Sequence, residues 1–404
     1  MHKRDYKLFL SLLFWSLVPS IYTAIRMNIV AVSNADINIL GQMEWFDLID
    51  EIIVTTLTVP LYFLLKSSHS DKHKNGSALL IAFGIYTIFT VVIALNVNSI
   101  AAFMEAEYAS HFLFLQSISM LIKFIASFAI IICTLNEKVK TINVLILTKI
   151  ICLIVFDVLL IPNLVDIGAA YSEIITNSII AVLSTLILFK YNLLSFKKLT
   201  FNWTIDWIKI GMFAGLQIFI DNIFYAIMIC KMVNAVSESG NYWVANNFIW
   251  GWLLVPVLCI SEIVKKNDLE TLTFKNSWSY CSIIAGVWII SIPLWKPFIT
   301  HAMAIEANEI LNILYILVPF YLAYLPSTII DSWFVSKGKV IYNSINSLIV
   351  NVVYYGVLYV LFQKNIFEAN MNFIIYMFGI GMIVHLIVSI AFYTFDKRAK
   401  VQKT

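Results

Sequence analysis

Charged side chains are scarce in this sequence of 404 residues. Aspartate, glutamate, lysine and arginine together form 13% of the chain, whereas 61% of it is hydrophobic. A soluble domain carries about twice that share of charged residues. Because so few polar side chains could not cover so much apolar surface, the composition excludes a water-soluble fold and indicates a chain that lies in lipid.

Motifs typical of enzymes and cofactor-binding proteins are also missing. The five cysteines form no CxxC or other metal-binding spacing, and we interpret them as small apolar core residues. The six histidines are scattered, with no HExxH motif among them. The sequence has no glycine-rich nucleotide loop and no polar stretch long enough for a soluble catalytic domain. We therefore expect no enzyme, no organic cofactor and no nucleic-acid partner.

Long apolar runs fill most of the chain. A transmembrane helix needs about 20 mostly apolar residues, and these runs predict an all-α, polytopic membrane protein with twelve such helices. The first run lacks a small-x-small cleavage site, so we expect it to remain as an uncleaved helix. The predicted spans lie near residues 7–33, 40–65, 77–97, 111–135, 142–162, 168–190, 206–233, 241–263, 277–296, 309–335, 340–362 and 372–395.

The basic residues predict the orientation of these helices, because cytoplasmic loops of membrane proteins are enriched in lysine and arginine. With the amino terminus inside, 20 of the 27 basic residues fall in cytoplasmic segments, and the outer loops hold only Lys296 and Lys364. We therefore predict a plasma (bacterial inner) membrane protein with both termini in the cytoplasm. The 20 residues are Lys3, Arg4, Lys7, Lys66, Lys72, Lys74, Lys138, Lys140, Lys190, Lys197, Lys198, Lys265, Lys266, Lys275, Lys337, Lys339, Lys397, Arg398, Lys400 and Lys403.

An internal repeat divides the chain into two lobes, residues 1–198 and 199–404. Both halves carry Ala-Val-Ser at the outer end of their first helix and a Val-Pro step in their second. An even number of spans between the copies makes this a parallel repeat. We predict two six-helix bundles that face each other across a cleft, which suits alternating access. The matching residues are Ala31-Val32-Ser33 with Ala235-Val236-Ser237, and Val59-Pro60 with Val255-Pro256.

Acidic residues gather in the second predicted helix, which contains Glu44, Asp47, Asp50 and Glu51. An ionisable group in the middle of a span costs about 2.5–3.5 kcal/mol on insertion scales, so each one suggests a function. By their spacing, Glu44, Asp47 and Glu51 share one helical face. Two interpretations stay open: a water-filled vestibule within the membrane, or an acidic face at the outer surface. In either place the acids would attract cations.

Further polar residues lie within other spans. Asp221 and Asn222 are near the middle of the seventh helix, where a desolvated carboxylate could carry a proton, hold sodium with neighbouring oxygens, or be a buried structural aspartate. Asp157 in the fifth helix and Asp331 in the tenth are weaker candidates. Lys123 lies in the middle of the fourth helix, and the sequence identifies no partner for it.

The first predicted helix contributes two further candidate residues, Arg26 and Asn28. Arg26 lies within the span, and we favour its pairing with the acids of the second helix. The residues that we expect to line a substrate cavity are Glu44, Asp47, Asp50, Glu51, Asn28, Arg26, Asp157 and Asn222.

Several stretches of the sequence form motifs, and the most extensive runs from Gly211 to Pro256. In it, Gly211-Met212-Phe213-Ala214-Gly215-Leu216 precedes Asp221, and Val244-Ala245-x-Asn247-Phe248 precedes Pro256. Weaker motifs are Asp157-x-x-Leu160-Ile161 followed by Ile167-Gly168-Ala169-Ala170, and Ser336-Lys337-Gly338-Lys339. Together these motifs cover about a third of the chain, and they resemble the multidrug and toxic compound extrusion (MATE) transporters of the multidrug/oligosaccharidyl-lipid/polysaccharide exporter superfamily.

The resemblance implies a cation-coupled antiporter that expels organic, often cationic, compounds against Na⁺ or H⁺. It further implies that Asp221 is the coupling acid, with Asn247 as a neighbouring ligand and Na⁺ between them, and it places Asp331 about a turn from the family's acid in helix ten. Asn28 stands where many members have an acid, which puts proton coupling through the first lobe in doubt. No cofactor besides the coupling ion is implied, and we expect a monomer that takes a small organic substrate from or through the bilayer.

Two other function classes compete with this one. A flippase for a lipid-linked oligosaccharide should present several basic residues to a pyrophosphate group, whereas Arg26 and Lys123 are the only mid-span candidates here and acids outnumber them. A membrane-embedded enzyme would need a catalytic constellation, and the scattered histidines offer none. The antiporter is therefore the leading hypothesis and the flippase the alternative.

Overall fold

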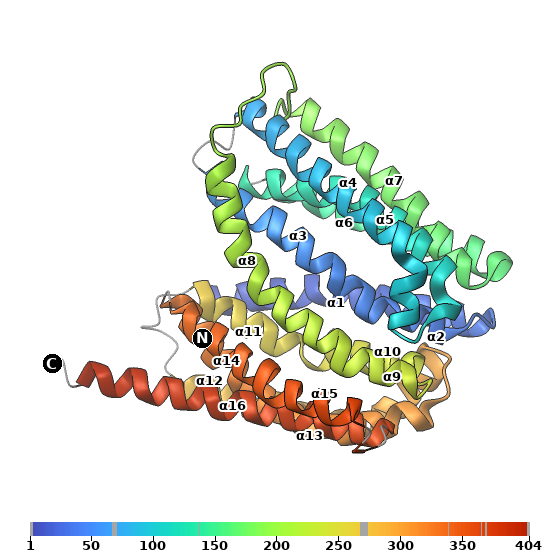
Figure 1. Cartoon of the computed structure of the whole chain (residues 1–404), viewed down its shortest axis with the longest axis vertical. Helices are drawn as coiled ribbons and strands as arrows, with labels where there is room; N and C mark the ends of the chain where they lie inside the picture. Colours follow the sequence, from blue (N-terminus) through green and yellow to red (C-terminus); the bar gives the residue numbers. More distant parts are fainter. Residues whose placement is uncertain are drawn as a thin grey trace. The chain divides into compact units, whose positions relative to one another are not determined.

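The computed structural model describes residues 3–66, 71–136, 138–266, 274–337, 339–364, 366–367 and 370–401. Every regular element in these ranges is helical (Figure 1). Elements that follow one another along the chain with little or no gap, such as α8, η2 and α9, form single long rods, and the element order gives twelve of them. The all-α architecture with twelve helices predicted from the apolar runs is thereby confirmed. Four of the cysteines, Cys133, Cys230, Cys259 and Cys281, are buried and all five are free thiols, as expected for small core residues.

The chain packs into two compact units, each with six of these rods. The middle unit comprises Ile29–Cys230, and the terminal unit comprises Met1–Asn28 together with Lys231–Thr404. The helices of the middle unit are α2 (Ile37–Gly41), α3 (Met43–Lys66), α4 (Lys72–Phe103), η1 (Glu107–Ala109), α5 (Ser110–Leu135), α6 (Val139–Leu164), α7 (Asp166–Lys190), α8 (Thr204–Tyr225) and η2 (Ala226–Cys230).

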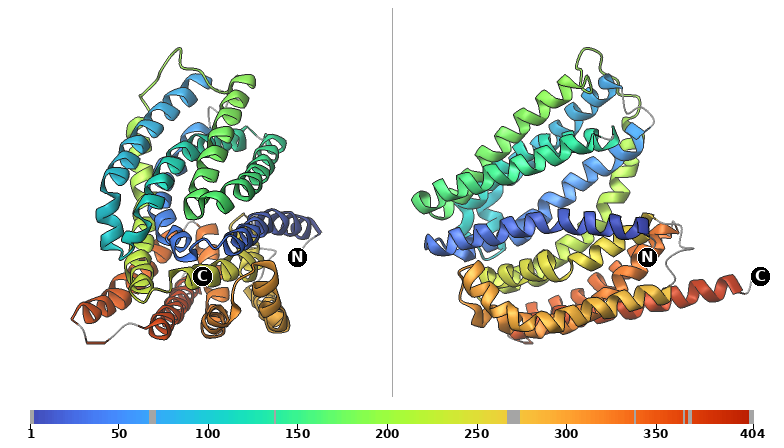
Figure 2. Two further views of the ribbon diagram at one scale, coloured as in Figure 1. Left: turned by 90° about the vertical axis from the view of Figure 1, so that its right-hand side faces the viewer. Right: turned by 180° about the vertical axis from the view of Figure 1, so that it is seen from behind.

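The terminal unit takes most of α1 (Lys3–Val32) and the second half of the chain. Its other helices are α9 (Lys231–Ala235), α10 (Ser239–Phe248), η3 (Ile249–Leu253), α11 (Val255–Lys266), α12 (Phe274–Pro297), η4 (Phe298–Ala302), α13 (Ala307–Ser336), α14 (Val340–Leu348), η5 (Ile349–Tyr355), α15 (Gly356–Gln363) and α16 (Met371–Val401). The start of α1 and the end of α16 lie at the same end of this unit (Figure 2).

The packed units differ in membership from the two sequence halves. Helix α1 belongs to the terminal unit and α8 to the middle unit, so each unit contains one helix from the other half. The division between residues 198 and 199 follows from a sequence repeat and not from packing. As the boundary between the two repeats it stays a prediction.

Most of the rods are long and apolar enough to cross a membrane. Ten helices among the described residues meet both conditions, and a bent pair, Ser239–Leu253 with Val255–Val264, supplies an eleventh span. The bend of 52° falls at the Val255-Pro256 step, where proline cannot donate a helical hydrogen bond. The remaining rod is α3, whose 24 residues extend about 36 Å, enough to cross the hydrocarbon core. The chain is therefore a multi-pass membrane protein.

In the middle unit, α5 packs against α3, α4, α6 and α7, and α8 packs along α3. Two glycines of α8 permit this last contact. A Cβ atom on Gly211 would lie 2.6 Å from the Thr56 carbonyl oxygen, and one on Gly215 would overlap the Thr56 side chain. Small residues four apart let two membrane helices approach closely, so the Gly211-x-x-x-Gly215 spacing positions α8 on α3.

In the terminal unit, α13 packs against α16 and α11. Helix α1 is held by close contacts with this unit: a Cβ atom on Gly251 would lie 2.9 Å from the Ser20 hydroxyl oxygen, and the Asn28 amide donates to the Ala302 carbonyl oxygen over 3.0 Å. These contacts explain why the first helix packs with the second half of the chain.

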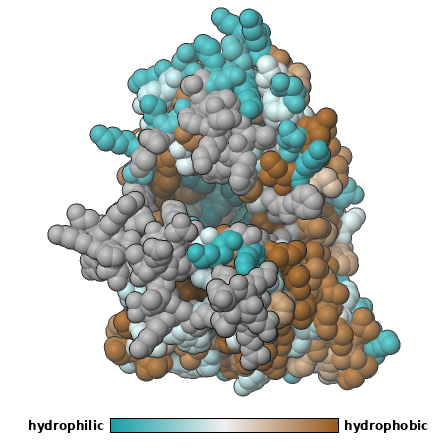
Figure 3. Space-filling view, turned by 90° about the vertical axis from the view of Figure 1, so that its left-hand side faces the viewer, coloured by the Kyte–Doolittle hydropathy of each residue, from teal (hydrophilic) through white to brown (hydrophobic). Residues whose placement is uncertain are grey.

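One end of the middle unit is strongly polar. Seen end-on, hydrophilic residues gather where α4 begins and α7 ends (Figure 3). There Lys190, Lys197 and Lys198 are exposed, and the connecting segment is fixed to α4 by a hydrogen bond from the Asn75 amide to the Leu193 carbonyl oxygen (2.8 Å). This is the end that the distribution of lysine predicts to be cytoplasmic.

Candidate functional site

The acidic residues of α3 meet residues from three other helices of the middle unit. Asp50 is the most enclosed of the four, with 4% of its surface exposed. Its carboxylate accepts a short hydrogen bond from the Tyr86 hydroxyl of α4 and lies 3.3 Å from the Lys123 ammonium of α5. Lys123, for which the sequence identifies no partner, is thus the cation of a partly buried ion pair.

The positions of Tyr86 and Lys123 along their helices fix the depth of this pair. Lys123 lies thirteen residues after α5 begins and twelve before it ends. Tyr86 lies fourteen residues after α4 begins and seventeen before it ends. Since both helices are candidate spans, Asp50 contacts groups halfway across two transmembrane helices. That depth agrees with the vestibule interpretation and not with a face confined to the outer surface.

A cavity of about 300 Å³ opens beside this pair. It is large enough for a small organic molecule, and its wall combines three carboxylates, one ammonium, a phenol and several apolar side chains. The lining residues are Asp47, Leu48, Asp50, Glu51, Val54, Tyr86, Met120, Lys123, Phe124 and Ser127.

Helix α8 supplies hydrogen bonds to two of the α3 acids. The Asn222 amide donates to Glu51 Oε2 and to the Leu48 carbonyl oxygen, each over 3.0 Å. The Tyr225 hydroxyl donates to Glu44 Oε1 over 3.2 Å. Asn222 was a predicted cavity residue, and the structure places it directly against the acids. Its neighbour Asp221 is half-buried on the same helix.

The cavity wall has an excess of negative charge. Among the described residues, neither Asp47 nor Glu51 has a cationic side chain at ion-pair distance, whereas Asp50 has Lys123. Four charged groups lie within electrostatic range of Asp47, two cations and two acids, and the Lys123 ammonium has the largest effect; the others are Glu173, Asp50 and Lys149. With its three carboxylates and its ammonium charged, the wall carries two more negative than positive charges. Such a site favours a cationic guest, because an uncompensated carboxylate is costly at this depth.

Asp157 takes a different place. It lies in α6, is fully buried and does not line the cavity. Elsewhere in the core of the same unit, the side-chain polar atoms of Gln116 in α5 and Thr176 in α7 are buried and have no hydrogen-bond partner. In the sequence, Gln116 and Thr176 lie within apolar runs, and nothing there indicates that their polar atoms are buried without a partner.

A second polar cluster occupies the terminal unit around Asp331 of α13. Its carboxylate lies 2.7 Å from His385 Nε2 and accepts a hydrogen bond from the Ser389 hydroxyl over 3.0 Å. The buried Asn346 amide donates in turn to the Ser389 hydroxyl oxygen over 2.8 Å. Asp331 therefore has partners on α16, which the sequence alone did not connect to it.

The remaining predicted residues also lie in the terminal unit. The Asn247 amide donates to the Trp243 carbonyl oxygen over 2.8 Å, within α10. The Arg26 guanidinium lies 5.4 Å from the centre of the Tyr22 ring. Asp221 and the α3 acids belong to the middle unit, so a sodium site shared by Asp221 and Asn247, and an ion pair of Arg26 with these acids, stay predictions. The predicted turn residue Gly338 lies outside the described residues.

No described cluster of three or more His, Cys, Asp or Glu side chains has the arrangement of a metal site. The acids of α3 instead contact hydroxyl, amide and ammonium groups of neighbouring helices. Their carboxylates can hold a proton, an organic cation or an alkali ion without the geometry that a transition metal requires.

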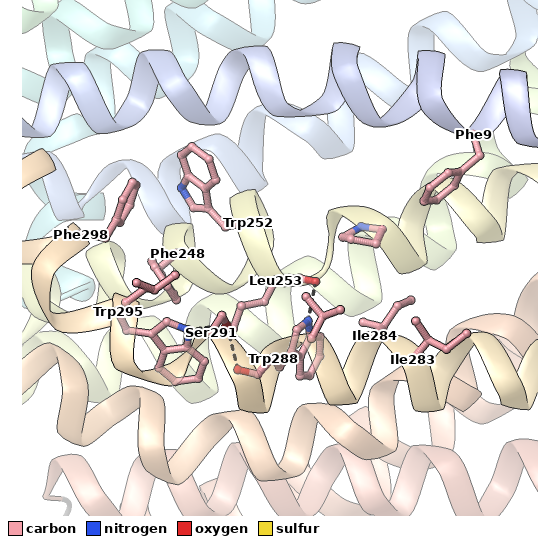
Figure 4. Close-up of a pocket in the computed structure, with 13 residues that line it drawn as sticks. Phe9, Phe248, Trp252, Leu253, Ile283, Ile284, Trp288, Ser291, Trp295 and Phe298 are labelled. Atoms are coloured by element: carbon pink, nitrogen blue, oxygen red, sulfur yellow. Dashed lines mark hydrogen bonds between the residues drawn. The ribbon is translucent and has the colours of Figure 1, made fainter.

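The terminal unit has a larger cavity of about 440 Å³, and its chemistry is the opposite. Trp252, Trp288, Trp295, Phe248 and Phe298 point into it, with Phe9 of α1 at one end (Figure 4). The indole of Trp288 donates to the Leu253 carbonyl oxygen beside the break at Pro256, and that of Trp295 to Ser291. Two of the indole donors are thus used within the wall, which leaves a mainly apolar aromatic surface.

Comparison with solved structures identifies the architecture, although no protein-family model and no curated protein sequence matches the chain. An inward-facing multidrug resistance MATE transporter of the MOP superfamily superposes with a TM-score of 0.73 at 14% identity, over 95% of this chain and 96% of the other. This chain has the MATE fold.

Two further MATE structures agree. A point mutant of the Vibrio cholerae MATE transporter VcmN gives a TM-score of 0.70 at 14% identity, over 98% of this chain and 96% of the other. The MATE multidrug transporter DinF-BH, solved with a bound compound, gives 0.69 at 15% identity, over 97% and 96%. At such low identity the likeness establishes the MATE fold alone, and the function must be argued from the site.

Proposed function

We propose that this protein is a secondary antiporter that exports organic cations in exchange for Na⁺ or H⁺ by alternating access. The proposal is carried by one observation: a cavity halfway along two spanning helices whose wall holds three carboxylates and a single ammonium. The MATE fold adds support, because the neighbours are described as multidrug transporters.

Carboxylates at this depth can couple two cations. A charged acid in a low-dielectric site must be balanced by a proton, a metal cation or a cationic ligand. If the same acids, or acids in contact with them, accept the coupling ion and the substrate in turn, each ligand stabilises its own loading state. A ligand shifts a conformational equilibrium only through such differential binding, and competition of this kind produces antiport.

In this mechanism different acids bind the substrate and the coupling ion. Asp47, Asp50 and Glu51 form the substrate wall, and Asp221, next to the Asn222 that binds Glu51, is the coupling acid. Asp331, supported by His385 and Ser389, is a further cation or proton carrier in the terminal unit. The protein works as a monomer in the inner membrane with both termini in the cytoplasm.

A flippase is the less suitable alternative. A pyrophosphate group needs several cationic donors, whereas the cavity of the middle unit offers Lys123, and this ammonium already contacts Asp50. Anionic lipid-linked substrates would also meet the carboxylates of Asp47 and Glu51, which have no cationic side chain at ion-pair distance among the described residues.

Flux in proteoliposomes tests the proposal. The purified protein is reconstituted, and uptake of a cationic dye and of an anionic dye of similar size is followed under an imposed Na⁺ gradient, a proton gradient or neither. We expect gradient-dependent movement of the cationic dye alone. Movement of the anionic dye, or no response of the cationic dye to either gradient, would refute cation antiport.

A further inference from the structure

The ion pair between Asp50 and Lys123 is unequal. The Asp50 side chain is 5% exposed, whereas the Lys123 side chain is 39% exposed and forms part of the cavity wall. The carboxylate is therefore the buried member of the pair, and the ammonium is the member that a molecule in the cavity can reach.

The carboxylate is fixed from its other side. The Tyr86 hydroxyl bonds to Asp50 Oδ1, and the Tyr86 ring stacks on Phe124 with centroids 4.4 Å apart and planes inclined by 16°. A stacked ring has little freedom to turn. Asp50 thus has a hydrogen-bond donor that does not depend on the contact with Lys123.

The ammonium is held more loosely. Its distance of 3.3 Å from Asp50 Oδ2 exceeds the 2.7–2.9 Å of a strong charge-assisted hydrogen bond. Lysine carries a compact charge on a flexible four-carbon stem, so its ammonium can move several ångströms without backbone change. One cation in this cavity is therefore built into the protein and can be displaced.

We propose that Lys123 is an internal competitor for the cation site: its ammonium neutralises Asp50 while the cavity is empty and leaves it when a lipophilic monovalent organic cation binds against Asp50, Tyr86 and Phe124. The proposal rests on the function proposed above. It explains how a buried acid stays neutralised in the empty state, and it makes Lys123 a determinant of affinity, since every guest must replace its contact.

Four variants distinguish this role from a merely structural ion pair. Lys123→Met removes the competing charge and keeps the length of the side chain, so Asp50 adds a free negative charge to the site. Asp50→Asn leaves the Lys123 charge to repel the guest. The double variant removes both charges and restores the net charge of the wall. Lys123→Arg keeps the competitor, and Lys140→Met, at an exposed position outside the cavity, controls for loss of one positive charge.

The measurement is equilibrium binding of tetraphenylphosphonium to the purified full-length protein in detergent at low ionic strength, with size-exclusion elution and thermal unfolding recorded for each variant. One unit charge about 10 Å away at an effective dielectric constant of about 20 changes affinity by at least tenfold. We expect Lys123→Met to bind at least tenfold more tightly than wild type and Asp50→Asn at least tenfold more weakly. The double variant, Lys123→Arg and Lys140→Met should lie within about threefold of wild type.

Other results overturn the inference. If Lys123→Met binds as wild type or more weakly while it elutes and unfolds as wild type, Lys123 is not a competitor. If Lys123→Met fails to fold, Lys123→Arg and the double variant are compared with wild type instead. A difference of tenfold or more in affinity between either variant and wild type contradicts the inference. Absence of binding in every protein also rejects it. If the affinities of the variants follow the expected order but the protein shows no gradient-driven flux in proteoliposomes, Lys123 is supported as the competitor and the antiport function is rejected.

Discussion

Replacing Tyr86 by phenylalanine removes one hydroxyl from the buried side of the Asp50 pair and leaves the rest of the ring. The ring still stacks on Phe124 at 4.4 Å, so packing should change little. What is lost is the donor to Asp50 Oδ1, on a residue with 4% exposure. A hydrogen bond to a charged group contributes about 1.5–3 kcal/mol, and we expect the free energy of unfolding to fall by about that amount.

Denaturant titration in mixed micelles, followed by tryptophan fluorescence, measures this difference. Tyr376→Phe provides the control, because Tyr376 is exposed and its contact in the structure is an edge-on packing of its ring with that of Phe320. We expect the control to unfold as wild type does. If Tyr86→Phe also unfolds as wild type does, the Tyr86 hydroxyl does not stabilise Asp50 and does not fix its carboxylate.

Three further predictions concern the coupling acid, the helix crossing and the topology. Asp221→Asn keeps size and removes charge, so it should abolish ion-driven export while the protein remains folded and inserted; export at the wild-type rate in proteoliposomes would make Asp221 a structural aspartate. Gly215→Leu should force α8 away from Thr56 of α3 and destabilise the protein by about 1–3 kcal/mol in the same titration, with partial recovery when Thr56→Gly is added; an unchanged or fully additive result would contradict the close crossing. Lys72→Cys, in a background without the native cysteines, should resist a membrane-impermeant maleimide in intact cells. Labelling from outside would place this residue outside the cell and contradict the predicted topology.

The helices could be predicted from the sequence because their signal is local. Each apolar run of about 20 residues can satisfy its backbone polar groups in lipid only as a helix, so ten of the twelve helices follow from the length and apolarity of their described residues. The unusual character of α3 was equally visible, since four acids within eight residues contradict their apolar surroundings.

The partners of these acids could not be predicted in the same way. Lys123 is 73 residues from Asp50 in the chain, and Tyr86 is 36 residues away. Nothing local in α4 or α5 indicates that they face α3. The grouping of α1 with the second half of the chain depends likewise on tertiary contacts such as Ser20 with Gly251, which a repeat in the sequence does not encode. The contact between His385 and Asp331 likewise joins residues that are 54 positions apart in the chain, so the sequence does not connect them.

In the proposed mechanism the acids of the middle-unit cavity bind the transported cation, and one double variant removes two of them. Asp47→Asn with Glu51→Gln removes the two carboxylates that have no cationic partner at ion-pair distance among the described residues and leaves the Asp50–Lys123 pair in place. The control is Glu107→Gln, an exposed acid of η1 outside the cavity. The measurement is gradient-driven uptake of a cationic dye in proteoliposomes over a range of dye concentrations. We expect the double variant to raise the apparent KM at least tenfold, and more at low ionic strength, while the control matches wild type. An unchanged KM and rate in the double variant would contradict the proposed mechanism.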